Sequence, residues 1–166
     1  MSLIELSARY VLGEVFTDDL PALAVDVILQ GSDSPSLAAL AGVTRDTAPA
    51  ELRDLFEHAL AELRIPVPSK LNAGQILKTI LAQRVLDGDL SPQVAAREIV
   101  SIYHSLHKEI KDHQYAGDGF DIANLFGAYH SYDDYHDNPG AARAAIDRTI
   151  VEECRRIVAT FPLSAG

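Results

Sequence analysis

The sequence predicts an all-α fold, a single-domain irregular bundle of about seven or eight helices over residues 1–166. Apolar residues recur at steps of three and four in the apolar segments, which is the spacing of an amphipathic helix. No segment alternates apolar and polar residues over the length of a strand. Serine or threonine followed by proline opens several segments and glycine closes several, and these are common start and stop signals of helices.

The first half of the chain contains four expected helices. Each begins at a capping residue, and each ends close to a glycine or a proline. In chain order they are Ser2 to about Leu12, Thr17 (as N-cap) to Gly31, Ser34 to Ala41, and Thr47 to Leu63. The residues Ile65 to Pro68 contain two prolines, so we expect a stiff connector there.

The second half contains four more expected helices. The first carries apolar residues on more than one side, which indicates burial near the middle of the bundle. In chain order they are Leu71 to Asp87, Ser91 to about Ile110, Phe120 to His136, and Pro139 to about Phe161.

Composition limits the partners and the compartment. The chain has 24 acidic and 14 basic residues and a formal charge of −10, which repels phosphates and anionic lipids. We therefore expect no nucleic acid or membrane partner, and a basic protein partner is favoured. The single Cys154 forms no disulfide within the chain, and we expect it to be a core residue in a cytoplasmic protein. The N-terminus lacks the pattern of a secretory signal.

One stretch differs from the rest. Residues 103–138 hold five of the six histidines and five of the six tyrosines. A helical projection of Phe120 to His136 places Asp133 and His136 on the same side as its apolar residues. Such groups need a partner when they are buried, because an unpaired buried charge costs several kcal/mol.

One hypothesis for this inward set is a divalent metal site. Imidazole and carboxylate ligands suit zinc, iron or manganese, and His107 lies at the edge of the preceding helix's apolar stripe. The candidate ligands are His107, Asp133 and His136, with His130 and Asp137 in reserve. Their spacing matches no established metal-binding pattern, so local hydrogen bonding is the competing interpretation.

The outward set suggests a different function. Acidic side chains steer a basic partner, and tyrosines provide contact area with a polar tip. The candidate partner-binding residues are Asp118, Asp121, Tyr132, Asp134 and Tyr135. Our first hypothesis is therefore a non-enzymatic acidic binding domain, such as an adaptor or an inhibitor, which needs no cofactor. The alternatives are a metal-binding protein or metal-dependent enzyme, and a homo-oligomeric structural module. Motifs for nucleotide binding or serine hydrolysis are absent from the sequence.

Overall fold

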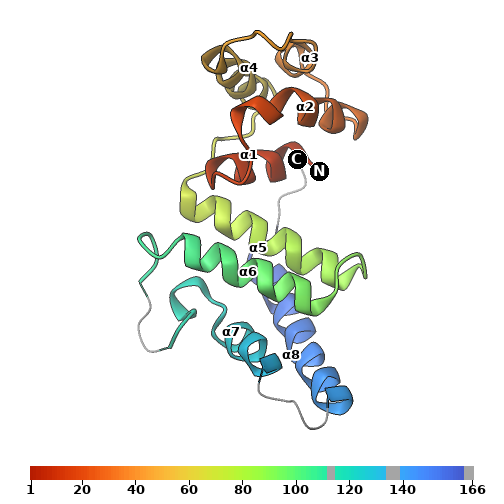
Figure 1. The fold of residues 1–166 in the computed structure, drawn as a ribbon, viewed down its shortest axis with the longest axis vertical. Coiled ribbons are helices and arrows are strands. Elements are labelled where there is room, and N and C mark those ends of the chain that lie inside the picture. The colour runs from red at the N-terminus through yellow and green to blue at the C-terminus, as the bar shows by residue number, and fades with distance from the viewer. Residues whose placement is uncertain (112–114, 134–138, 163–166) are drawn as a thin grey trace. The chain divides into compact units, whose positions relative to one another are not determined.

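The computed structural model describes residues 1–111, 115–133 and 139–162, and these residues are entirely helical or irregular (Figure 1). They form eight α-helices and three short 3₁₀ helices. The described part of the chain contains no β-strand. The prediction of an all-α fold is confirmed. None of the described helices is long and apolar enough to cross a membrane.

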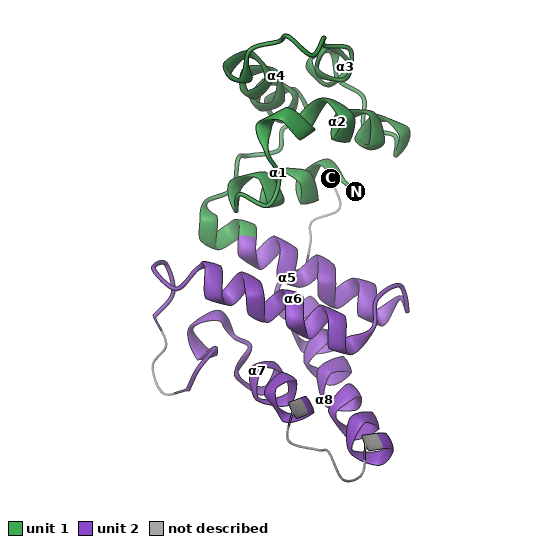
Figure 2. Cartoon of the chain, in the orientation of Figure 1, with its two compact units in different colours: residues 1–73 green, residues 74–166 purple. Residues whose placement is uncertain are grey.

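The chain divides into two compact units, residues Met1–Ala73 and Gly74–Gly166 (Figure 2). The boundary falls inside α5 (Lys70–Leu86), so this helix contributes its first turn to one unit and the remainder to the other. The expectation of a single domain over residues 1–166 stays a prediction.

The first unit consists of four further helices and one 3₁₀ helix: α1 (Leu3–Val11), η1 (Thr17–Asp19), α2 (Leu20–Leu29), α3 (Pro35–Ala41) and α4 (Pro49–Glu62). The caps act as the sequence predicts at two starts, because the hydroxyls of Ser2 and Ser34 accept backbone N–H groups of Glu5 and Leu37. Thr17 is not the N-cap of α2, since it begins η1, which leads directly into the longer helix.

The core of the first unit forms where α3 packs against both α2 and α4. Leu20, Leu37 and Leu60 are almost completely buried there. Phe56 joins them and meets Tyr10 edge to face, with ring centroids 5.3 Å apart. Apolar burial along helix faces of this kind is the main stabilising contribution to a small helical unit.

The second unit contains the rest of α5 and five elements after it: α6 (Pro92–Ser105), η2 (Asp118–Phe120), α7 (Ala123–His130), η3 (Ser131–Asp133) and α8 (Pro139–Thr160). Helices α6, α7 and α8 pack against one another. Cys154 is buried on α8, which confirms the expectation of a core cysteine. Burial, followed by the charge of Glu153, raises the pKa of its thiol to about 12, so it is a poor nucleophile.

Helix boundaries in the second unit also differ from the prediction. The expected helix from Phe120 to His136 is wrong at its start, because Asp121 has a left-handed backbone conformation with φ of 58°. That conformation ends η2 and delays α7 until Ala123. The sequence predicts that the helix from Ser91 reaches about Ile110. In the structure α6 ends at Ser105, and hydrogen-bonded turns follow it.

Candidate functional site

The residues predicted to bind a metal do not form a described cluster. His107 is exposed, and its Nδ1 lies 3.1 Å from the carbonyl oxygen of His104. His130 is exposed, and its ring packs on Phe126 with centroids 4.5 Å apart. Within residues 1–111, 115–133 and 139–162, no three histidine, cysteine or acidic side chains are placed to hold a metal ion.

The other predicted ligands fall largely outside that search. Asp133 is the last residue of η3, and its side chain is not described. His136 and Asp137 lie outside the described residues. The metal site therefore stays a prediction.

The predicted partner-binding residues that the structure describes are engaged within the chain. The Asp118 carboxylate accepts a hydrogen bond from the backbone N–H of Tyr115 at 3.1 Å. The Tyr132 hydroxyl donates to Asp147 over 2.5 Å. Burial, together with this acidic partner, raises the pKa of Tyr132. Asp134 and Tyr135 lie outside the described residues.

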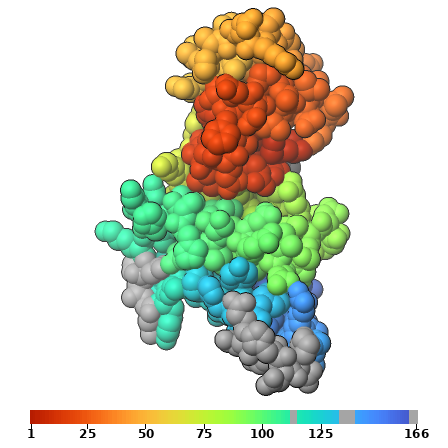
Figure 3. Space-filling model, in the orientation of Figure 1, coloured from red at the N-terminus to blue at the C-terminus, as the bar shows by residue number. Residues whose placement is uncertain are grey.

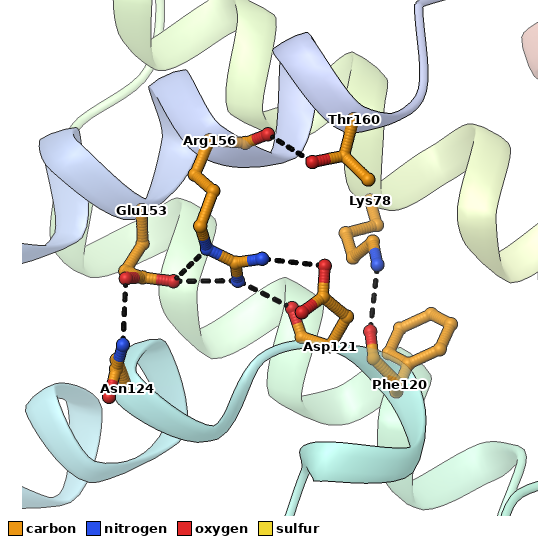
Figure 4. Close-up of polar contacts among 7 residues, drawn as sticks. All are labelled: Lys78, Phe120, Asp121, Asn124, Glu153, Arg156 and Thr160. Atoms are coloured by element: carbon orange, nitrogen blue, oxygen red, sulfur yellow. Dashed lines mark hydrogen bonds and ion pairs between the residues drawn. The ribbon is translucent and has the colours of Figure 1, made fainter.

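The fifth member of that set, Asp121, belongs to an ion network that joins α8 to the start of α7 (Figure 4). The Arg156 guanidinium donates to the Asp121 carboxylate at 2.6 Å and to the Asp121 carbonyl oxygen at 2.8 Å. The same guanidinium donates to Glu153 at 2.7 Å, and the other oxygen of Glu153 accepts from the Asn124 amide at 3.0 Å. Arg156 thus holds Asp121 in its left-handed conformation.

In this network one cation, Arg156, pairs with two carboxylates. Burial alone would lower the pKa of Arg156, but its bonds to Glu153 and Asp121 outweigh that effect and raise it. The Glu153 residue is only 8% exposed, so its charge depends on this partner. The network stabilises the junction between two helices and leaves no group free for chemistry.

A buried lysine next to the network was missed by the sequence analysis. Lys78 on α5 is 3% exposed, and its Nζ donates to the Phe120 carbonyl oxygen at 2.7 Å, as Figure 4 shows. The ammonium also lies 4.4 Å from the centroid of the Phe120 ring. Burial lowers the pKa of Lys78 to about 8, attraction by Asp121 partly offsets this, and repulsion by Arg156 adds to it.

A lysine with a lowered pKa is a common nucleophile, but Lys78 is enclosed and its nitrogen is bonded to a backbone carbonyl. Its position therefore fits a structural role at the end of η2. The signal that could have found it is helical spacing. Lys78 falls between Leu77 and Leu81 on the inward stripe of α5, where a charged side chain must find a partner.

A groove of about 620 Å³ lies between α7 and α8. Small side chains line most of it, and Gly127 faces it with nothing within 4 Å of an added Cβ. The acidic members of the lining are Glu152 and Glu153, and Glu153 already binds Arg156. The hydroxyls of Ser131 and Thr149 line it, and each donates to the backbone carbonyl four residues earlier. No histidine or lysine that could activate them is among the described residues that line this groove.

Three exposed apolar side chains of the first unit lie on or just before α2. Leu29 is 79% exposed, Phe16 is 74% exposed and Val25 is 43% exposed. The opposite side of α2 is buried through Leu20, Ala24 and Val27. The helix is therefore apolar nearly all round, although only one of its sides is covered. We name the exposed side the α2 face, and helical spacing assigns to it Ala22, Val25, Asp26 and Leu29.

The sequence before, within and after α2 is acidic. Residues 10–44 contain five acidic residues and no lysine, arginine or histidine. Glu14 is paired with Arg9 at 2.7 Å, and Asp19 accepts the backbone N–H of Phe16. The remaining three, Asp18, Asp26 and Asp33, are exposed and have no hydrogen-bond or ion-pair partner in the part of the chain that the structure describes. The segments that carry them form part of the surface seen in Figure 3.

No family model, no curated protein and no solved structure matches this chain.

Proposed function

We propose that this chain is a non-enzymatic protein-binding module that recognises a positively charged partner, and that it does so through the α2 face. The observation that carries the proposal is an exposed apolar stripe on α2, set in a 35-residue stretch that has five acids and no basic residue. Exposed apolar area is stabilised by burial against a partner, and unpaired carboxylates favour a partner of opposite charge.

The distribution of charge supports this assignment. Asp18, Asp26 and Asp33 have no described cation to neutralise them, so their field extends into solvent. The two carboxylates of the ion network in the second unit are both paired with Arg156. A basic partner therefore gains more at the α2 face than at the network.

The experiment is affinity capture with cross-linking from the source cell lysate, followed by binding measurements on the purified pair. The test variant carries Asp18→Asn, Asp26→Asn and Asp33→Asn. The matched control carries Asp46→Asn, Asp54→Asn and Glu57→Gln, which remove the same charge from exposed positions elsewhere in the first unit.

The expected result is a loss of affinity of at least about tenfold in the test variant, and a change below about threefold in the control. Raising the ionic strength should weaken binding by the parent chain, because exposed charge pairs are screened by salt. Capture that is equal for both variants and insensitive to salt would contradict the proposal.

A further inference from the structure

The spacing of the α2 face determines what shape of partner it fits. Val25 and Leu29 are one turn apart, and Ala22 lies one turn before Val25. These positions form the i±3 and i±4 ridges that pack into the grooves of another helix. The small Ala22 allows the partner backbone to approach closely at one end of the stripe. The larger Leu29 projects at the other end.

The backbone of α2 excludes strand addition as the binding mode. Its backbone N–H and C=O groups are hydrogen-bonded within the helix. An extended segment therefore finds no strand edge to pair with on this face. A helix satisfies its own backbone hydrogen bonds, so it can bury an apolar stripe without leaving backbone N–H and C=O groups unpaired. A helical partner is thus favoured over an extended one.

The carboxylates set the chemistry of the partner's flanks. Asp26 lies within the α2 face, Asp18 precedes the helix and Asp33 follows it. A second copy of this chain would bring the same unpaired carboxylates together, which is repulsive. Lysine or arginine beside the partner's apolar stripe would instead pair with them.

We infer that the α2 face binds an amphipathic helix whose apolar stripe is flanked by lysine or arginine residues. This inference rests on the proposed protein-binding function, and it adds the secondary structure and the residue pattern of the partner. Two or three turns of partner helix match the length of α2, which is about 15 Å for its ten residues.

The test uses the full chain and three labelled synthetic peptides. The first has leucines at i, i+3, i+4 and i+7 with lysine and arginine on both sides of the stripe. The second has the same composition in an order that spreads the leucines around the helix, and the third replaces each basic residue with glutamate. Fluorescence anisotropy gives the affinity, circular dichroism gives the helicity of the bound peptide, and amide exchange reports protection on α2.

The first peptide should bind at least about tenfold more tightly than the other two and gain helicity on binding. Val25→Ser with Leu29→Ser in the chain should weaken it by about tenfold or more. Val67→Ser is the control, because Val67 is 55% exposed in the same unit but lies outside the α2 face. Thermal unfolding of each variant checks that the fold is kept.

Several results would overturn the inference, and some of them spare the proposed function. Equal, salt-sensitive binding of the first and second peptides, weakened by the three aspartate substitutions, would retain a basic partner and reject the amphipathic helix. Failure of the first peptide to bind would also reject the helix, and if lysate capture fails as well, the proposed function falls with it. A dimer of this chain that Val25→Ser and Leu29→Ser dissociate would show that the occupant is a second copy.

Discussion

The α2 face and the ion network of the second unit use similar residues in opposite ways. Around the α2 face, Asp18, Asp26 and Asp33 are exposed without a described partner. In the network, Asp121 and Glu153 are held by Arg156. Acidic composition alone therefore does not identify a binding surface. A carboxylate is available to a partner only when it is not already ion-paired within the folded chain.

The contrast also concerns apolar residues. In the first unit, the side chains of Val25 and Leu29 are exposed to solvent, although the opposite side of α2 is fully buried. In the second unit, Lys78 lies inside among apolar neighbours, with its nitrogen on the Phe120 carbonyl. Four test variants show whether the second unit depends on these internal contacts, and whether the acidic residues in and beside the α2 face contribute to stability.

The largest expected effect is on the pH dependence of stability at Lys78. Because its folded pKa is lowered to about 8 from 10.5, the unfolded chain between these values holds a proton that the folded chain has lost. Raising the pH through this window therefore increases the free energy of unfolding, and lowering the pH towards 8 removes that gain. Lys78→Met should lack this increase, which amounts to at most about 3 kcal/mol.

Denaturant titrations of the parent and Lys78→Met chains between pH 7 and pH 10.5 measure the difference. The thiol of Cys154 acts in the opposite direction, because its raised pKa makes stability fall as the pH rises above 9. That contribution is common to both chains and cancels in the difference. Parallel curves would show that folding does not lower the pKa of Lys78.

A smaller effect is expected from packing at Gly74. A Cβ there would lie 2.4 Å from Leu106 Cδ1 and 3.3 Å from atoms of Ile102 and Phe120, so Gly74→Ala should destabilise the chain by about 1–3 kcal/mol. Gly127→Ala is the matched control, because its Cβ meets nothing within 4 Å. That change should stabilise α7 by about 0.5–1 kcal/mol, through helix propensity. Thermal unfolding distinguishes these opposite signs, and equal shifts would contradict them.

Next in size is the loss of the ion network. Arg156→Gln removes the cation from Glu153 and the bonds that hold Asp121 in its left-handed conformation. Arg156 is partly exposed, so the cost should be moderate, about 1–2 kcal/mol in the free energy of unfolding. Chemical denaturation measures it. Arg155→Gln serves as the control because Arg155 is exposed on the same helix, and an equal loss in both variants would show that the network adds no stability.

The smallest effect is expected at the α2 face. Asp18→Asn, Asp26→Asn and Asp33→Asn together should change the free energy of unfolding by less than about 0.5 kcal/mol, because these groups make no described contact. The measurement is the denaturant midpoint of the triple variant. A large destabilisation would mean that these carboxylates are part of the fold, and the comparison between the two regions would fail.

Much of the fold could be predicted from local signals. Ser34 followed by Pro35 defines the start of α3, and Pro139 the start of α8, because cap and proline geometry are decided within one turn of chain. Less of the candidate site could be predicted from the sequence. Helical projection selected residues 120–136 as a continuous helix, although Asp121 interrupts it through a contact with Arg156, which is 35 residues away.

The helical class, most helix starts, the acidic charge and the core position of Cys154 can all be predicted from the sequence. Each of these follows from composition or from a period shorter than a few turns. Three features depend on the tertiary structure: which carboxylates are paired with a cation, why Lys78 is buried, and which side of α2 stays exposed. Those outcomes depend on residues far apart in the chain meeting in space, as Lys78 meets Phe120 and Asp121 meets Arg156.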